Sequence, residues 1–290
     1  MISPYVTHII ILIGIYAILA MSLNLTIGFT GLLNLGHVAF FGIGAYTSAL
    51  LTLAGVPFPL AFLCAGLAAS LFGLLLMVAV RKIKGDYLAL VTLGFSFVIY
   101  SVLLNWTGLT RGPLGIPGIP KPSFFGLTLS SNQGYLFLVA ITAALSGLFL
   151  WCLTRSPYGR VLEAVRDDEL AASVLGKHTF KLQAHSMMVS SFFAGLAGSL
   201  FAHYLTYIDP SSFFLSEIIL VLTIVIVGGL ASLRGSIIAA VIILVIPELL
   251  RFVGLPSAIV GPMRQILYAA LLLGVLLLRP KGLLGKVDLA

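Results

Sequence analysis

Residues 1–80 contain no Lys, Arg, Asp or Glu. Within that stretch, apolar runs of about 20 residues, the length that an α-helix needs to cross a bilayer, follow one another with only short turns between them. A water-soluble domain does not offer such a stretch, because about a quarter of the residues in soluble domains are charged. Over the whole chain, 9% of the residues are charged and 60% are hydrophobic. The sequence therefore predicts an integral membrane protein.

Nine membrane-spanning helices are predicted, and eight to ten are compatible with the pattern. The predicted spans are residues 6–27, 32–53, 58–80, 87–106, 134–153, 184–206, 215–232, 236–253 and 262–278. These runs are too long and too continuous for the strands of a membrane barrel, which alternate apolar and polar residues. We therefore expect an all-α, polytopic transmembrane helical bundle that forms a single domain over residues 1–290. The first run lacks a basic segment before it, so we interpret it as a span rather than a removable signal peptide.

Lys and Arg lie mostly on one side of this predicted bundle. With nine spans, twelve of the cations fall on one side: Arg81, Lys82, Lys84, Arg155, Arg160, Arg166, Lys177, Lys181, Arg234, Arg279, Lys281 and Lys286. The other side has four, which are Arg111, Lys121, Arg251 and Arg264. By the positive-inside rule the first side is the cytoplasm, so the C-terminus lies inside and the N-terminus outside. The net charge of +7 follows from this topology, and no nucleic acid is implied, because the cations form no stripe with aromatic residues between them.

The segment 154–183 is the longest predicted cytoplasmic connection. It contains the stretch "SPYGRVLEAVRDDELAASVLGK", in which seven of 22 residues are charged. Pro157 is suited to a first helical turn, the following apolar residues recur with helical spacing, and Gly176 is suited to a C-terminal cap. We expect one or two short amphipathic helices parallel to the membrane. Residues 160–169 hold four acids and two arginines, which favours docking to a partner protein over binding to anionic lipid alone.

The predicted second span combines glycines with polar side chains at membrane depth. The residues concerned are Gly31, Asn34, Gly36, His37, Gly42 and Gly44. One interpretation is close helix packing, with Asn34 and His37 satisfied by neighbours. The other is an irregular or broken helix that lines a substrate path, since non-helical backbone is tolerated there. We take Asn34, His37, Gly42 and Gly44 as candidate path residues, and expect the small residues of 192–204 to pack a second helix closely.

Two further segments have a distinctive composition. The predicted outer loop 107–133 is rich in Pro and Gly, which break helices, and it is either a simple connection or a surface that contacts something outside. Its candidate residues are Arg111, Gly112, Gly115, Pro117 and Gly118. The stretches "TIGFTGLLN" (26–34) and "VIVGGLASLRG" (225–235) each end an apolar helix in a glycine-rich turn on the inner side. They are possible corresponding points of an internal repeat.

Motifs for catalysis are missing from the sequence. It contains no HExxH or GxSxG pattern, and "KGLLGKVD" lacks both the first Gly and the Ser or Thr of a phosphate-binding loop. The polar residues His203, Asp209, Glu217 and Glu248 fall near predicted span ends, where they can reach water. A proton-driven carrier would place carboxylates in mid-span. We expect a transport subunit without an ATP site, a metal or another cofactor.

Four blocks carry a resemblance to a known family. They are the segment 156–200, "GLLNLGHVAFFGIGAYTSALL", "DYLALVTLGF" and "TRGPLGIPGIP". Together, in the family's order and over nearly the whole chain, they resemble the permease subunits of bacterial branched-chain amino-acid ABC importers, specifically the M-type member of the H/M pair. The resemblance implies a multi-pass subunit of the bacterial inner membrane. It also implies four kinds of partner: a second permease subunit, two cytoplasmic ATPase subunits, a periplasmic substrate-binding protein and the surrounding membrane lipid.

The resemblance also implies roles for individual residues. Glu163, Ala164 and Gly176 resemble elements of the loop through which such permeases dock to the ATPase, and we extend the candidate coupling surface along the same segment. The added residues are Arg166, Asp167, Asp168, Glu169, Leu170 and Leu175. The family often has a second Gly where Arg111 stands, so a role for the outer loop does not carry over directly.

The expected function is import of branched-chain or other neutral amino acids by alternating access, with the ATPases driving the change. Within the same class, urea or another small polar solute is an alternative substrate. The alternative from a different functional class is a stand-alone secondary carrier or channel for a small neutral solute. This alternative predicts transport by this polypeptide alone, without ATP or partner subunits.

Overall fold

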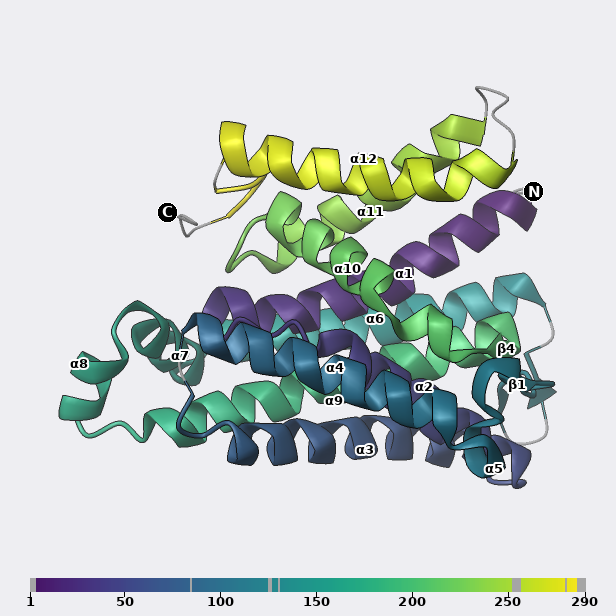
Figure 1. The fold of residues 1–290 in the computed structure, drawn as a ribbon, viewed down its shortest axis with the longest axis horizontal. Coiled ribbons are helices and arrows are strands. Elements are labelled where there is room, and N and C mark those ends of the chain that lie inside the picture. The colour runs from purple at the N-terminus through teal and green to yellow at the C-terminus, as the bar shows by residue number, and fades with distance from the viewer. Residues whose placement is uncertain are drawn as a thin grey trace.

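The computed structural model describes residues 4–83, 85–124, 127–129, 131–251, 257–279 and 281–285. Two of the predicted cytoplasmic cations, Lys84 and Lys286, lie outside this range. The described chain is a bundle of long helices that run roughly side by side, with short helices and strands at the two ends (Figure 1).

The helices follow the predicted spans closely. They are α1 (Pro4–Asn24) with its continuation η1 (Leu25–Phe29), α2 (His37–Leu53), α3 (Phe58–Ala79), α4 (Asp86–Asn105), α5 (Thr107–Thr110), η2 (Gly112–Leu114), α6 (Asn132–Arg155), α7 (Pro157–Asp167), α8 (Glu169–Val174), α9 (Thr179–Leu205), η3 (Pro210–Phe213), α10 (Leu215–Gly228), α11 (Leu233–Arg251) and α12 (Ser257–Leu278). The strands are β1 (Ile116–Pro117), which pairs antiparallel with β4 (Tyr207–Ile208), and β2 (Ser123–Phe124), which pairs antiparallel with β3 (Leu127–Thr128).

Seven described helical segments are long and apolar enough to cross a membrane. They are Pro4–Phe29, Phe58–Ala79, Asp86–Asn105, Asn132–Arg155, Thr179–Leu205, Pro210–Gly228 and Gly261–Leu278. The two other predicted spans, 32–53 and 236–253, correspond to α2, a shorter apolar helix of 17 residues, and to α11, with 19 residues. The prediction of an all-α polytopic membrane protein is therefore confirmed.

Helices α2 and α9 form the closely packed centre of the bundle. Helix α9 lies against α1, α2 and α3, and its glycines let the backbones touch. A Cβ atom added to Gly44 would come 2.3 Å from the Cα of Gly195, and one added to Gly198 would come 2.0 Å from the carbonyl oxygen of Phe41. Only glycine fits at such short distances. The close packing predicted for residues 192–204 is therefore present.

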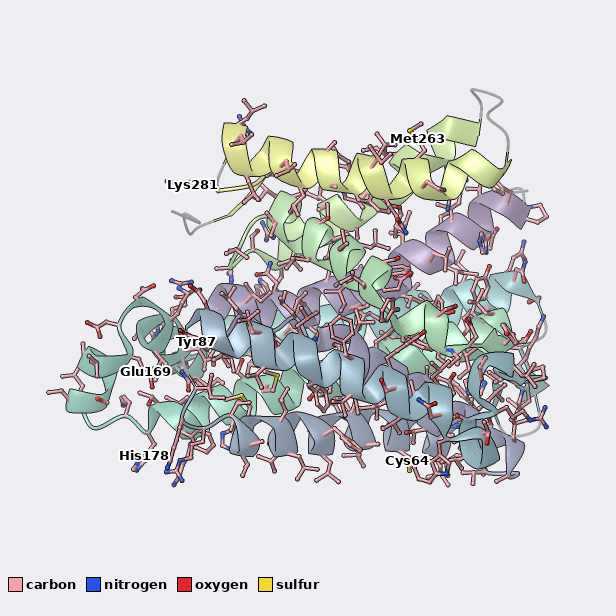
Figure 2. All side chains as sticks on the ribbon, in the orientation of Figure 1. Cys64, Tyr87, Glu169, His178, Met263 and Lys281 are labelled. Carbon is pink, nitrogen blue, oxygen red and sulfur yellow. The ribbon has the colours of Figure 1, made fainter. Side chains whose placement is uncertain are left out.

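The two ends of the bundle differ in their connections. Helices α7 and α8 project at one end, and the paired strands β1 and β4 lie at the other (Figure 1). Glu169, His178 and Lys281 lie at the first end, whereas Cys64 and Met263 lie at the second (Figure 2). The loops predicted to be cytoplasmic are thus separated in space from those predicted to be external.

Candidate functional site

The backbone is not helical between α1 and α2. Helix α1 ends in the π-helical turn η1, residues 30–36 are irregular, and α2 begins only at His37. Gly31 has a φ of +74°, a conformation that favours glycine. The second predicted span therefore has an irregular start, which we call the α1–α2 break (residues 30–36), and a helical part that contains the closely packed Gly44. That the break lines a substrate path stays a prediction.

Two candidate path residues are buried here, Asn34 within the break and His37 at the start of α2. The Asn34 side-chain oxygen accepts a hydrogen bond from the Gly36 backbone N–H (3.0 Å), and its amide nitrogen lies 3.4 Å from the sulfur of Met187. His37 Nε2 lies 3.0 Å from the Ser22 hydroxyl. His37 Nδ1 has no hydrogen-bond partner in the described part of the chain. Neighbouring groups thus contact both polar ends of the Asn34 side chain, whereas one ring nitrogen of His37 has no hydrogen-bond partner among the described residues.

The two other candidate path residues contact neighbouring helices. A Cβ atom added to Gly42 would lie 3.1 Å from the ring of Phe213, and Gly44 faces Gly195 on α9 as described above. These two glycines allow close approach of side chain and backbone. The structure does not bring them to the same place as the α1–α2 break.

Asn24, at the end of α1 and just before the first glycine-rich stretch, bonds to the second one. Its amide nitrogen lies 3.1 Å from the carbonyl oxygen of Gly229 and 2.8 Å from the hydroxyl of Ser236. Its side-chain oxygen accepts a hydrogen bond from the backbone N–H of Ala231 (3.0 Å). The sequence analysis missed Asn24, although a lone Asn inside an apolar run was a signal for it.

The predicted cytoplasmic helices are present as α7 and α8. Ser156 caps α7 by accepting a hydrogen bond from Gly159 N–H, and Asp168 caps α8 in the same way from Ala171 N–H (2.9 Å). Such caps satisfy N–H groups that lack helical partners. Gly176 follows α8 with a φ of +78°, as expected of a terminating glycine.

The apolar side chains of this segment divide between two surfaces. Leu162 and Val165 on α7 are buried, whereas Leu170, Val174 and Leu175 are 73%, 86% and 80% exposed. Of the other predicted coupling residues, Ala164, Asp167, Asp168 and Gly176 are exposed, and Glu163, Arg166 and Glu169 are half-buried. Exposed leucine and valine side chains beside acidic residues form a surface suited to a protein partner.

Arg166 connects α7 to the membrane helices by a hydrogen bond. Its Nη1 donates a hydrogen bond to the carbonyl oxygen of Gly28 in η1 (2.8 Å), and its Nε donates one to Asp167 (2.9 Å). A Cβ atom added to Gly31 would come 2.9 Å from the Arg166 Cγ. The end of α7 therefore rests directly on η1 and the α1–α2 break.

The outer loop is folded against the end of α9. Ile116 pairs with Ile208, and Pro117 pairs with Tyr207. Gly112, Gly115 and Gly118 have positive φ angles, and Arg111 has a φ of +60°. This is a left-handed conformation that suits Gly better than Arg.

A cavity of about 560 Å³ opens near this loop. Pro57, Phe58, Pro120, Lys121 and His203 are among its lining residues. His203 is 1% exposed, so the prediction that it reaches water is wrong. The reason is that the outer loop folds over it, and His203 Nδ1 lies 2.7 Å from the Pro120 carbonyl oxygen.

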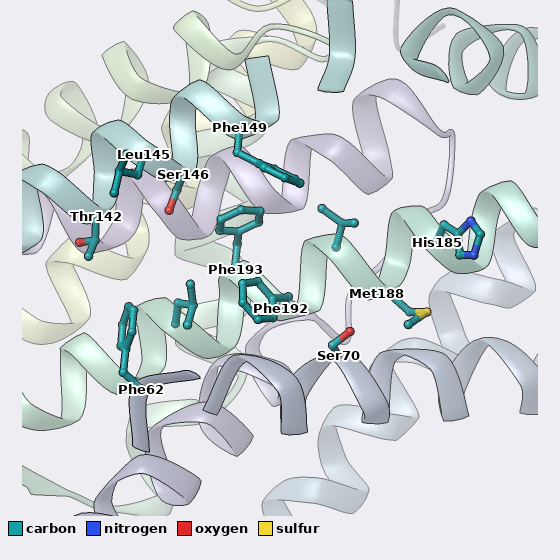
Figure 3. Close-up of a pocket in the computed structure, with 12 residues that line it drawn as sticks. Phe62, Ser70, Thr142, Leu145, Ser146, Phe149, His185, Met188, Phe192 and Phe193 are labelled. Carbon is teal, nitrogen blue, oxygen red and sulfur yellow. The ribbon is translucent and has the colours of Figure 1, made fainter. Parts of the chain in front are cut away.

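A groove of about 540 Å³ between α3, α6 and α9 has a different character (Figure 3). Its labelled residues include Phe62, Leu145, Phe149, Phe192 and Phe193, together with a few hydroxyl groups and His185 (Figure 3). An amino acid carries two opposite charges that need charged or polar partners. This lining matches hydrocarbon, such as lipid chains, better than a zwitterion.

The described residues contain no group of three or more His, Cys, Asp or Glu side chains that could hold a metal ion. Three carboxylates at or near the predicted span ends contact neighbouring polar groups. Glu217 accepts a hydrogen bond from Tyr16 (2.8 Å), Glu248 lies 3.4 Å from Arg264, and Asp209 accepts hydrogen bonds from Ser211 and Ser212.

Curated relatives match nearly the whole chain. The permease protein LivM of the Escherichia coli high-affinity branched-chain amino acid transport system is 38% identical over 308 aligned positions, covering 98% of this chain and 71% of that protein. A probable LivM of Methanocaldococcus jannaschii is 26% identical and covers 97% of this chain and 93% of that protein. The Escherichia coli permease LivH is 26% identical and covers 94% of this chain and 92% of that protein. No solved structure matches significantly.

A family profile gives the same result. The family described as "Branched-chain amino acid transport system / permease component" matches residues 5–276. The matching proteins are transport permeases and not enzymes, so the chain is a transport subunit, in agreement with its helical architecture. The match covers eight of the nine predicted spans in full and reaches residue 276 of the ninth, and we conclude that this chain belongs to the family of branched-chain amino acid transport system permease components.

Proposed function

We propose that this chain imports branched-chain or other neutral amino acids through the bacterial inner membrane by alternating access, as one permease subunit of an ATP-binding-cassette importer. It acts with a second permease subunit, two cytoplasmic ATPase subunits and a periplasmic substrate-binding protein. Its C-terminus and α7–α8 face the cytoplasm, in line with the positive-inside rule. The names of the relatives LivM and LivH support this proposal, because both are permeases of branched-chain amino acid transport systems.

The observation that carries the proposal is the placement of α7 and α8. Their exposed apolar residues, Leu170, Val174 and Leu175, lie on helices that project from one end of the bundle (Figure 1). The proposed coupling surface, within residues 154–183, comprises Glu163, Ala164, Arg166, Asp167, Asp168, Glu169, Leu170, Leu175 and Gly176. A partner that buries these leucines gains about 1.5–3 kcal/mol for each fully buried side chain. The ATPase subunit is that partner in our proposal.

The same segment is connected to the interior of the bundle. Arg166 holds α7 on η1, and Asn24 holds the end of α1 on the α10–α11 turn. A movement of α7 therefore acts on α1, on the α1–α2 break and on α10 together. We propose that the substrate path passes the break at Asn34 and His37, and that Gly42 and Gly44 keep α2 closely packed along it.

In this proposal the permease receives the substrate from the binding protein and does not bind it tightly. The described helices carry few charged side chains at membrane depth, which suits an amino acid with an apolar side chain that must leave again. Selection among leucine, other neutral amino acids and urea is then made mainly by the binding protein. The outer loop residues Arg111, Gly112, Gly115, Pro117 and Gly118 form the proposed surface that meets it.

The test replaces Leu170 and Leu175 with Glu in one variant. We expect this variant to lose most ATP-dependent leucine uptake and most of the ATPase subunit that co-purifies with it, because two charges would be buried in the contact. The control is L114E, since Leu114 is also 80% exposed but lies in the outer loop. It should keep the ATPase bound. If the double variant retains normal uptake and ATPase binding, α7–α8 is not the coupling surface.

A further inference from the structure

Two arginines line a small, partly open pocket between the end of α6 and the start of α11. Thr154 and Arg155 come from the last turn of α6, whereas Ser232 and Arg234 come from the α10–α11 turn and the first turn of α11. The pocket measures about 190 Å³. It is therefore too small for a drug-sized ligand, which occupies about 300–1,000 Å³, but it can receive a single charged group.

The charges at this pocket all have the same sign. Both arginines are exposed, and neither forms an ion pair with a residue that the structure describes. The Arg155 guanidinium lies 4.7 Å from the ring centre of Trp151, which also lines the pocket. The described lining contains no carboxylate. The pocket therefore favours an anion, and guanidinium groups match the geometry of phosphate particularly well.

Ser232 adds a hydroxyl group to the two arginines. Its Oγ accepts a hydrogen bond from the backbone N–H of Gly235 (3.1 Å), and its own O–H has no acceptor among the described residues. This proton is available to an anion in the pocket.

Each arginine also lies at the end of an exposed apolar stripe. On α6, the exposed residues at helical spacing before Arg155 are Trp151, Leu148, Ala144, Ile141 and Phe137. On α11, those after Arg234 are Ile237, Ile238, Val241, Ile242 and Val245. The two helices contact each other, and both pack against α1.

The length of the stripes matches one leaflet of a bilayer. From Arg234 to Val245 an α-helix rises about 16.5 Å, at about 1.5 Å per residue. Half of the hydrocarbon core of a bilayer is about 15 Å thick. Trp151 next to Arg155 is also typical of the boundary between hydrocarbon and water. A phosphate in the pocket can therefore be continuous with acyl chains along the stripes.

This combination favours a phospholipid over a soluble anion. A free phosphate would occupy the arginines and leave the stripes unexplained, whereas a phospholipid carries a phosphate and acyl chains in one molecule. The ammonium group of phosphatidylethanolamine would find no carboxylate in the described lining. Basic pockets between membrane helices on the cytoplasmic side are known to bind anionic lipid headgroups. The charges therefore favour an anionic phospholipid.

We infer that this pocket binds the headgroup phosphate of an anionic phospholipid whose acyl chains lie along the exposed stripes of α6 and α11. Arg155, Arg234 and Ser232 donate hydrogen bonds to the phosphate. The lipid belongs to the leaflet at the α7–α8 end of the bundle, and the inference rests on the proposed function only in calling this leaflet cytoplasmic. The bound headgroup connects the end of α6, from which α7 continues, to the α10–α11 turn that Asn24 contacts.

The test uses tryptophan fluorescence, because the chain contains only two tryptophans, Trp106 and Trp151. In W106F, Trp151 at the pocket is the single reporter. The full chain is placed in phosphatidylcholine nanodiscs, and its quenching by phosphatidylglycerol brominated near the headgroup end of the acyl chains is compared with quenching by phosphatidylethanolamine brominated in the same way. We expect phosphatidylglycerol to be preferred. R155Q and R234Q should each lower this preference about fivefold, the effect of one cation on the binding of an anionic lipid.

Two controls accompany this experiment. R160Q removes the same charge from an exposed position outside the pocket lining, and it should keep the preference. W151F leaves Trp106, which follows α4 at the opposite end of the bundle, and it should show no preference. Equal quenching by the two lipids, or a preference that R155Q and R234Q leave unchanged, overturns the inference. If inorganic phosphate displaces phosphatidylglycerol, the pocket takes a soluble anion and the lipid assignment is wrong.

A second measurement does not depend on Trp151. Added phosphatidylglycerol should raise the unfolding temperature of the detergent-solubilised, assembled transporter, because a ligand of the folded state stabilises it. R155Q and R234Q should abolish this increase, and R160Q should retain it. No increase in the wild-type transporter would show that another subunit covers the site, which contradicts the inference. Failure of both lipid tests with normal ATP-dependent uptake contradicts only this inference, whereas lipid binding without ATP-dependent uptake contradicts only the proposed function.

Discussion

At the scale of single residues, Arg166 connects α7 to the end of α1. Its hydrogen bond to the Gly28 carbonyl oxygen involves a charged donor, and such bonds contribute about 1.5–3 kcal/mol. We expect R166Q to keep the ATPase bound but to lower the amount of leucine transported per ATP hydrolysed. Parallel measurements of uptake and ATP hydrolysis check this expectation.

The matched control for that experiment is R160Q. Arg160 lies on the same helix but is exposed, so its loss should leave the ratio of uptake to hydrolysis unchanged. An R166Q transporter with a normal ratio would show that the contact to Gly28 plays no part in transmission.

Asn24 has a structural role that can be measured as stability. Replacing it with Leu leaves the backbone N–H of Ala231 without the acceptor that it now has, and an unsatisfied buried polar group costs about 1–3 kcal/mol. We expect N24L to lower the unfolding temperature of the detergent-solubilised complex. Asn105 is the comparison, because its side chain bonds to Ser101 on the exposed surface. N105A should unfold at the wild-type temperature, and an equal loss in both variants would contradict the assigned role.

At the scale of secondary-structure elements, the closest contact joins α2 and α9. A methyl group at Gly44 would lie 2.3 Å from the backbone of Gly195, so G44A must push the helices apart. We expect G44A to reduce both the yield of folded protein and uptake. Gly94 on α4 has open space around its Cβ position, and G94A should be neutral or slightly stabilising, since Ala is favoured over Gly in a helix by about 1 kcal/mol. A fully active G44A would contradict the packing described here.

The sequence predicted these elements well where hydrophobicity determines them. Helices α7 and α8 followed from the spacing of apolar residues around Leu162 and from the terminating Gly176. The beginning of α2 at His37 could not be located, because the irregular backbone before it depends on contacts with Arg166 and Thr92 that are distant in sequence. The buried position of His203 was missed for the same reason, since the outer loop that covers it is far away along the chain.

At the scale of the whole molecule, the chain forms one bundle whose two ends have different surfaces. Apolar periodicity and charge distribution were sufficient to predict the helical class and the separation of the loops. The contacts of Asn24 with the second glycine-rich turn required the structure. Hydrophobic patterns do not specify which helices are neighbours, and polar contacts such as these depend on that arrangement.

The central claim is that this chain transports only as part of an ATP-driven assembly. The most direct measurement is uptake of radiolabelled leucine into liposomes that contain either this chain alone or the chain with the second permease and both ATPases, with the binding protein outside and ATP inside. We predict uptake only with the complete set and ATP, and loss of this uptake in the variant with Leu170 and Leu175 replaced by Glu. Leucine uptake by this chain alone, without ATP, would contradict it.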